Sequence, residues 1–325
     1  MKTLSIVPLT GHCKLWLLAI NLLTLLLLTS CSSSDSSVPF SPKNNLERKV
    51  FVLGAQVDDF GNLELYVHGT DPSGDPLNVT SLQAASLSVD GTSYTDGDGN
   101  LTITEVTESD NFLSLALVTD YSNSTSGELD FVANILVGML DNLPQVYEAQ
   151  VMTFSDSYEI HQNWTDDLVA LKTAVVQPHT DRNKTALYDS MGVALEGDVG
   201  TTGLFERCRV AHLLVVFTDG DDNMSNVYTD LDLGAIVNND KTVVVVLGTS
   251  DAKLDVLTTL AGDHGAIVQV TDPLSLVAEV DSWSTSLSNM VKFTLSGIDV
   301  TSKTVSITVG TQTVDVIPNS HCKPE

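Results

Sequence analysis

The pattern of apolar and polar positions changes twice along this chain. Residues 48–109 contain short runs in which the two kinds of position alternate, and the same pattern returns after residue 290. Alternation with a period of two predicts β-strands with one buried face. Clusters of Gly, Pro, Asp and Asn between the runs indicate turns. The predicted strands cover residues 50–53, 63–67, 85–89, 101–103, 291–295, 305–309 and 313–316.

The middle of the chain, residues 110–287, has a different pattern. Nearly continuous apolar runs alternate with stretches of helical character, and such runs are typical of parallel strands buried on both faces. Alternating strands and helices predict a doubly wound α/β fold with helices on both faces of a mostly parallel sheet. The expected strands cover residues 113–119, 149–154, 210–217, 242–247 and 266–270.

The α/β segment therefore interrupts a β region. The C-terminal piece, residues 288–325, holds three strands at most, which is near the limit of independent stability. Pairing with residues 48–109 would give about seven strands, enough for a small all-β sandwich. We expect one composite β domain with the α/β domain inserted in it, and two separate β appendages are the alternative.

Polar fragments follow two of the buried strands. Asp120, Ser122 and Ser124 come after residues 113–119, and Asp219 comes after residues 210–217. The carboxyl edge of an open α/β sheet is where ligands bind. With Thr185, these residues offer carboxylate and hydroxyl oxygens, hard donors that suit Mg²⁺, Mn²⁺ or Ca²⁺ and suit zinc or copper poorly. The sequence predicts a metal site at this edge.

Three motifs carry a family resemblance. D-x-S-x-S at residues 120–124, T-x-L-Y-D at residues 185–189 and T-D-G at residues 218–220 occur in this order. The pattern resembles the von Willebrand factor type A (VWA) family and its metal-ion-dependent adhesion site, over roughly residues 110–287. The resemblance implies a Rossmann-like domain that binds Mg²⁺, with Mn²⁺ and Ca²⁺ as alternatives, through Asp120, Ser122, Ser124, Thr185 and Asp219. It also implies that an acidic side chain of a protein ligand completes the coordination.

A second interpretation of the first motif needs no metal. Asp120 and Ser122 could instead cap the helix that follows, because Asp and Ser are preferred N-cap residues.

The N-terminus indicates secretion. Lys2 and Lys14 precede an apolar stretch that covers residues 15–30, and residues 1–30 contain no acidic residue. The segment 28–31 resembles a bacterial lipobox, which implies that Cys31 is lipidated after cleavage; the alternative is an uncleaved anchor, for which the apolar stretch is short. Residues 31–47 are rich in Ser and Pro and predict a tether. Ser32 resembles the sorting signal for the outer membrane of the bacterial cell envelope.

The net charge excludes one class of partner. The formal charge is −27, and loss of two lysines with residues 1–30 makes it −29 for the mature chain. Nucleic acid is therefore excluded as a partner, because binding it requires basic surfaces. Attraction to anionic lipid headgroups is also disfavoured, so membrane attachment is expected through the lipid.

Two of the four cysteines are available for a disulfide. Cys13 leaves with the signal sequence and Cys31 carries the lipid, so Cys208 and Cys322 remain as a pair in an oxidising compartment. We expect a disulfide between them.

The segment 96–100, Asp-Gly-Asp-Gly-Asn, has the acidic residues and glycines found in calcium loops. An EF-hand requires Gly at position six and Glu at position twelve, where this chain has Leu101 and Thr107. A hairpin turn is the better prediction.

Enzyme signatures are absent from the sequence. It contains no G-x-S-x-G, H-E-x-x-H or P-loop motif, and the spacing of its histidines does not match a metal site. We expect a non-enzymatic, lipid-anchored envelope protein that binds a protein ligand through its metal. The alternatives are a scaffold subunit of an envelope complex with a structural metal, and a hydrolase that depends on Asp120.

Overall fold

The computed structural model of the protein describes residues 41–42, 50–58, 60–70, 75–107, 110, 113–143, 147–179, 183–240, 242–249, 251–269 and 285–316, and the structural statements below concern these residues. The signal sequence, most of the expected tether, Cys31 and Cys322 lie outside them. The cleavage site, the lipid and the disulfide therefore stay predictions.

A mostly parallel sheet forms the centre of the α/β part. Its order is β14-β13-β12-β7-β8-β9, and only β9 is antiparallel to its neighbour. Every residue of β7, β8, β12 and β13 is buried, which explains their continuous apolar runs. The strands are β7 (Leu113–Asp120), β8 (Tyr147–Phe154), β9 (Tyr158–Thr165), β12 (Ala211–Thr218), β13 (Val243–Gly248) and β14 (Ala266–Gln269).

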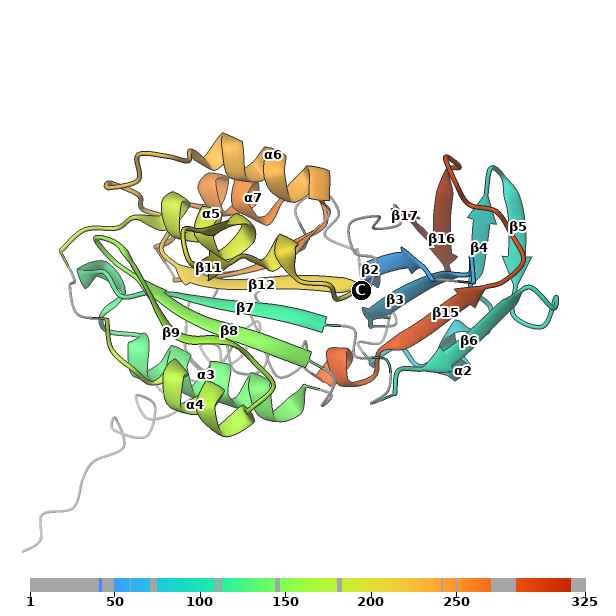
Figure 1. The fold of residues 1–325 in the computed structure, drawn as a ribbon, viewed down its shortest axis with the longest axis horizontal. Helices are drawn as coiled ribbons and strands as arrows, with labels where there is room; N and C mark the ends of the chain where they lie inside the picture. The colour runs from blue at the N-terminus through green and yellow to red at the C-terminus, as the bar shows by residue number, and fades with distance from the viewer. Residues whose placement is uncertain are drawn as a thin grey trace, which may run out of the picture. The chain divides into compact units, whose positions relative to one another are not determined.

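Helices cover both faces of this sheet (Figure 1). Leu115 and Leu117 of β7 pack in one core with α3 and α4, whereas Ala116 and Val118 pack in another with α5, α6 and α7. The predicted doubly wound fold is confirmed. The helices are α3 (Leu129–Asn142), α4 (Leu168–Val175), α5 (Leu187–Glu196), α6 (Asp230–Asp240) and α7 (Leu254–Ala261).

Strands from both ends of the chain form the β part. One antiparallel layer has the order β2-β3-β15-β6 and the other β17-β16-β4-β5. Of the strands that follow the α/β part, β15 lies between β3 and β6, and β16 pairs with β4. Leu65 and Phe293 of the first layer share a core with Leu87 and Ile307 of the second. The elements are β2 (Val50–Val57), β3 (Leu63–Gly69), α2 (Val79–Leu82), β4 (Ser86–Val89), β5 (Thr92–Thr95), β6 (Leu101–Glu105), β15 (Val291–Leu295), β16 (Val305–Val309) and β17 (Gln312–Val316).

A close backbone contact joins β2 to β12. Ala211 pairs with Gly54, and a Cβ on Gly54 would lie 2.2 Å from the carbonyl oxygen of Val210. Only glycine allows this approach, because any side chain would meet backbone.

Several elements differ from the sequence prediction. The segment 96–100 is a turn, but it is not a hairpin turn, since β5 and β6 belong to different layers. Asp98 shapes it by accepting hydrogen bonds from the backbone N–H groups of Thr95, Asn100 and Leu101. Residues of the expected tether form β1 (Ser41–Pro42), which pairs with β14. The other unpredicted elements include β5, β9, β10 (Gly197–Asp198), β11 (Thr201–Thr202) and the 3-10 helices η1 (Asn123–Thr125) and η2 (Leu204–Glu206).

Candidate metal centre

Asp120 is the last residue of β7, and its side chain is fully buried. One carboxylate oxygen accepts a hydrogen bond from the backbone N–H of Ser122 at 2.8 Å. The other accepts one from the Thr218 hydroxyl at 2.9 Å. Contacts from the turn after β7 and from the end of β12 thus hold this carboxylate in one orientation at the carboxyl edge of the sheet.

The turn after β7 brings two hydroxyls beside this carboxylate. The Thr125 hydroxyl donates to the carbonyl of Asp120 at 2.8 Å and closes the turn. The hydroxyl oxygens of Ser122 and Ser124 lie 3.0 Å apart, the first buried and the second exposed. Ser122 precedes η1 but makes no side-chain cap, and α3 begins only at Leu129. Helix capping therefore does not account for these two serines.

Asp219 enters the site from the end of β12. Its carboxylate accepts a hydrogen bond from the backbone N–H of Asp221 at 2.9 Å, and its backbone carbonyl accepts one from the backbone N–H of Lys253 at 3.0 Å. Gly220 has φ = +79°, a left-handed conformation that glycine adopts without strain. The glycine of the T-D-G motif thus serves the sharp turn that follows Asp219.

The charge of Asp219 acts on Asp120. Burial, and to a smaller extent the nearby negative charge of Asp219, raise the pKa of Asp120 to about 6, against hydrogen bonds from Ser122 and Thr218 that lower it. Two carboxylates in a buried position repel each other, and a bound cation would relieve that repulsion.

Thr185 reaches the same edge through backbone contacts. The N–H of Ala186 donates to the carbonyl of Ser155, just beyond β8, at 2.7 Å. Thr185 exchanges hydrogen bonds of 3.0 Å with Asn223, which lies four residues after Asp219. The Thr185 side chain is buried, and its hydroxyl makes no hydrogen bond to any described residue. This hydroxyl is free to bind a ligand.

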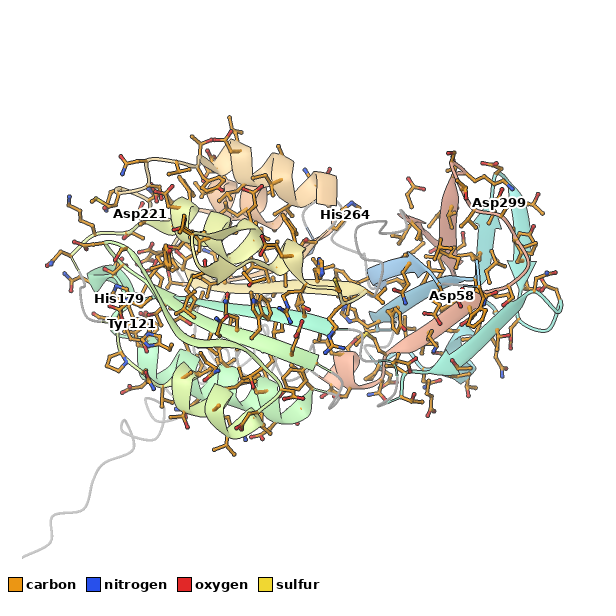
Figure 2. All side chains as sticks on the ribbon, viewed as in Figure 1. Asp58, Tyr121, His179, Asp221, His264 and Asp299 are labelled. Atoms are coloured by element: carbon orange, nitrogen blue, oxygen red, sulfur yellow. The ribbon has the colours of Figure 1, made fainter. Side chains whose placement is uncertain are left out.

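The donor set fits a hard divalent cation. It comprises two carboxylates and three hydroxyls, and in the described part of the chain no group of three or more His, Cys, Asp or Glu side chains could hold a metal. Figure 2 shows Tyr121, which follows β7, and Asp221, which follows β12, toward the same end of the sheet. The residues that could hold the cation are Asp120, Ser122, Ser124, Thr185 and Asp219.

A sequence profile described as "von Willebrand factor type A domain" matches residues 114–282, just over half of the chain. The chain belongs to this family. The central sheet and its helices form the VWA domain. No curated protein matches the chain.

Three solved structures are similar to part of the chain. The mussel byssus protein PTMP1, "with zinc occupied MIDAS motif", shares 18% identity at a TM-score of 0.47 over 58% of this chain and 49% of its own. BatB from Bacteroides thetaiotaomicron shares 14% identity at a TM-score of 0.44, over 54% of this chain and 98% of its own. A von Willebrand factor type A protein from Catenulispora acidiphila shares 13% identity at a TM-score of 0.45, over 74% of this chain and 49% of its own. The chain thus spans about half the length of the mussel and Catenulispora chains.

Asp189 organises the loop beside the VWA site, a role that sequence analysis missed. It lies in the first turn of α5, and its carboxylate accepts hydrogen bonds from the backbone N–H groups of Asn226, Val227 and Tyr228 at 2.9 to 3.0 Å. Its own N–H donates to the Ser225 hydroxyl at 2.9 Å. The only sequence signal was its place in the T-x-L-Y-D motif.

Asp221 and Asp222 support the site loop in different ways. Asp221 forms an ion pair with Lys253. Asp222 accepts hydrogen bonds from the Ser225 hydroxyl at 2.6 Å and from the backbone N–H of Tyr188 at 3.4 Å. Asp222 thus contacts the start of α5 and not that of the following helix α6.

Two histidines meet near the end of β8, although their spacing in the sequence gives no indication of it. His161 Nε2 and His179 Nδ1 lie 2.7 and 3.0 Å from the Thr153 hydroxyl, and a Glu159 oxygen lies 3.9 and 3.8 Å from these nitrogens. A third histidine, His212, is hydrogen-bonded to the carbonyl of Arg207 at 3.1 Å. It is a satisfied core histidine, as its place in an apolar strand suggests.

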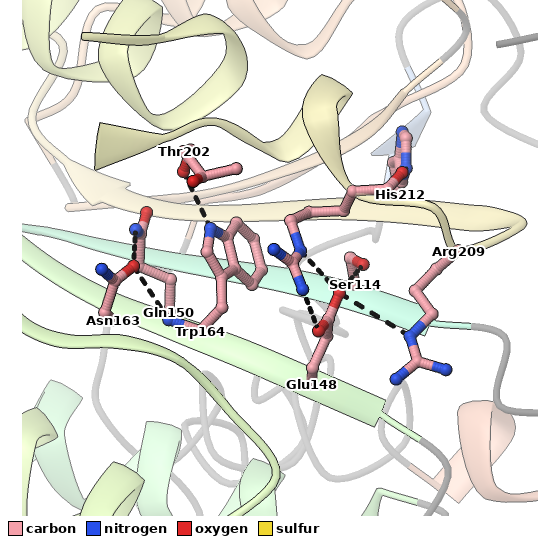
Figure 3. Close-up of polar contacts among 9 residues, drawn as sticks. Ser114, Glu148, Gln150, Asn163, Trp164, Thr202, Arg209 and His212 are labelled. Atoms are coloured by element: carbon pink, nitrogen blue, oxygen red, sulfur yellow. Dashed lines mark hydrogen bonds and ion pairs between the residues drawn. The ribbon is translucent and has the colours of Figure 1, made fainter. Parts of the chain in front are cut away.

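A charged network lies at the opposite edge of the sheet, where β7 and β8 begin (Figure 3). Glu148 accepts hydrogen bonds from Ser114 at 2.8 Å and from the Arg207 guanidinium at 2.8 and 2.5 Å, and Arg209 lies 3.7 Å away. The Arg207 guanidinium also lies 5.3 Å from the centre of the Trp164 ring. This network ties the segment before β12 to β8, away from the candidate site.

Proposed function

We propose that this protein is a lipid-anchored component of the bacterial cell envelope that binds a protein ligand through a divalent metal at the VWA site. In this proposal the metal is Mg²⁺, or Mn²⁺ or Ca²⁺, and a carboxylate of the ligand completes its coordination. The protein acts by binding and catalyses no reaction.

The observation that carries the proposal is the convergence of Asp120 and Asp219 at the ends of β7 and β12. Both carboxylates are buried and close enough for their charges to interact, and three hydroxyls accompany them. Hydroxyl donors are neutral, so a cation that binds the three hydroxyls directly and the two carboxylates mainly through bridging waters keeps most of its charge. It would attract an additional anion, and Ser124 is exposed on the side from which a ligand carboxylate would approach.

Each residue has a part in the binding event. A bound divalent cation would supply a positive charge for the ligand's carboxylate. Asp120 and Asp219 would act mainly through bridging waters, and the hydroxyls of Ser122, Ser124 and Thr185 would contribute oxygens without adding negative charge. Thr218 holds the Asp120 carboxylate in place, and Asn223 holds the backbone of Thr185.

The location rests on the N-terminal sequence. The apolar stretch that ends in Leu-Thr-Ser-Cys at residues 28–31 supports lipid attachment at Cys31 and, with Ser32, the outer membrane. Among the described helices, none is long and apolar enough to span a bilayer.

Calorimetry and ligand capture test the proposal together. Mg²⁺ and Mn²⁺ are titrated into the mature chain, and the immobilised chain is exposed to envelope extract with or without chelator. Thr185→Val removes one donor and keeps the side-chain shape, and Thr308→Val in β16 is the matched control. The wild type and the control should bind metal, capture the ligand and release it in chelator. Thr185→Val should bind neither the metal nor the ligand.

The outcomes separate the alternatives. Metal binding that survives Thr185→Val would contradict the site. A partner retained equally in chelator would point instead to a scaffold with a structural metal.

A further inference from the structure

We propose that Lys184 makes the VWA site specific for ligands with two acidic groups. The first group occupies the metal, as in the proposed function on which this inference rests, and the second pairs with the Lys184 ammonium. The preferred partner is therefore an acidic peptide segment and not one with a single carboxylate.

The backbone of Lys184 is fixed beside the candidate metal centre. Lys184 directly precedes Thr185, and consecutive Cα atoms are about 3.8 Å apart. Its N–H donates to an Asp156 carboxylate oxygen at 2.6 Å, and its carbonyl accepts from the Ser155 hydroxyl at 2.8 Å. A side chain on a fixed backbone loses less entropy on binding, which favours its use in recognition.

The side chain of Lys184 is exposed and has no acidic partner among the described residues. Its ammonium contacts the sulfur of Met224 at 3.5 Å, and a thioether cannot neutralise a charge. Three other lysines of the described residues form ion pairs. Lys172 pairs with Asp141, Lys253 with Asp221, and Lys292 with Asp110.

The nearby carboxylates are engaged elsewhere. The Asp156 oxygen nearest Lys184 accepts hydrogen bonds from two backbone N–H groups, and Asp222 accepts from Ser225 and Tyr188. Asp189 is occupied by the backbone of the loop after Asn223. Lys184 is thus an uncommitted positive charge at an edge where the surrounding acidic residues repel a partner's other carboxylates.

Because Lys184 directly precedes Thr185, we expect the two acidic groups to lie close together in the ligand. Alternate side chains of an extended peptide point to the same side and lie roughly 6 to 7 Å apart. A carboxylate at the metal and another two residues away would therefore lie on the same side of such a peptide, and both could face the protein. We expect the pattern acid-x-acid in the ligand.

A peptide selection tests this inference. Phage-displayed random peptides of twelve residues are selected on the mature chain in Mg²⁺ and eluted with chelator. The same selection uses Lys184→Met, which keeps an apolar side chain of similar length, and Lys172→Met, which removes an equal charge next to α3 and away from the site. Peptides selected on the wild type and on Lys172→Met should be enriched in two acids at this spacing. Those selected on Lys184→Met should need only one.

Calorimetry with the best synthetic peptide gives a second readout. Lys184→Met should weaken binding by about 3- to 5-fold at low salt, as expected for an exposed ion pair, and high salt should reduce the difference. Equal affinity for both proteins, or no enrichment of a second acid, would overturn the inference while leaving the proposed function intact. Absence of any chelator-eluted peptide would count against both.

Discussion

At the scale of single residues, Asp120 combines two opposed requirements. It is fully buried, yet it lies close enough to Asp219 for the two charges to interact. Without a cation, the charged form of Asp120 destabilises the fold, because burial and Asp219 both raise its pKa above the ordinary value of 3.8. With a cation, the same arrangement becomes a ligand set.

Substitution of Asp120 by Asn should separate these two effects. In chelator at pH 7 the variant should be at least as stable as the wild type, because it removes a buried charge. In Mg²⁺ at 100 times its Kd, the free energy of unfolding of the wild type should rise by about 2.7 kcal/mol, and that of the variant should change little. Thermal unfolding with and without Mg²⁺ measures both, and the exposed Asp130→Asn is the control. Equal gains for Asp120→Asn and wild type would rule Asp120 out as a ligand.

At the scale of elements, strand ends supply the donors and loops hold them. β7 and β12 deliver Asp120 and Asp219. Thr185 is held by hydrogen bonds with Asn223 and by those that its neighbours Lys184 and Ala186 make with Ser155. Asp189 then holds residues 226–228 beside the site. The geometry of the edge thus depends on contacts between loops that are 30 or more residues apart.

Asp189→Ala should loosen this loop without unfolding the domain. Three backbone N–H groups lose a charged acceptor, and each such hydrogen bond contributes on the order of 1 kcal/mol or more. The amides of residues 226–228 should exchange with deuterium about 10- to 100-fold faster, while those of β12 stay protected. Exchange measured by NMR or mass spectrometry reports this directly. Unchanged protection of the loop would contradict the role given to Asp189.

Glu148 should make stability depend on pH. Although burial opposes its ionisation, hydrogen bonds from Arg207 and Ser114 and the arginine charges hold its pKa below the usual 4.5. The folded pKa is lower than the unfolded one, so the stabilisation is present above about pH 4.5 and is lost as pH falls through the folded pKa.

The Glu148→Gln variant tests this dependence. The substitution should lower the free energy of unfolding by about 1 to 3 kcal/mol at pH 7, and the difference from wild type should shrink below pH 4. Denaturant unfolding across pH measures it, with the exposed Glu105→Gln as the control. A difference that stays constant down to pH 3 would mean that Glu148 is not ionised in this network.

At the scale of the whole molecule, the two ends of the chain carry the remaining predictions. Cys31 should be the mature N-terminus and carry the lipid. Cys31→Ala should leave the precursor uncleaved, since processing of lipoproteins depends on that thiol. Mass spectrometry of protein from the envelope should find a lipidated Cys31, and an unmodified terminus elsewhere would remove the anchored interpretation.

The disulfide between Cys208 and Cys322 belongs to the same scale. Cys208 is exposed between Arg207 and Arg209, and it forms no disulfide with a residue that the structure describes. A bond to Cys322 would close a loop on the order of 110 residues, for which chain entropy allows at most about 4 to 5 kcal/mol. Peptide mapping without reduction should find the linked pair. Free thiols at both positions in protein from the envelope would refute it.

The periodicity of the chain was sufficient to predict the main strands and the doubly wound fold. Continuous apolar runs require burial on both faces, and this follows from composition alone at β7, β12 and β13. β9 was missed because it is an edge strand whose residues are half-exposed or exposed, so it lacks such a run. β5 was missed because its four residues are polar or only partly buried.

The sequence by itself determined the kinds of donor and their places after β7 and β12, because motifs and strand ends are local features. The tertiary structure decided which distant residues support them. Thr218 reaches Asp120, Asn223 holds Thr185, and Lys184 is left without an acidic partner. Those relations depend on the packing of segments far apart in the chain, and no local periodicity encodes such contacts.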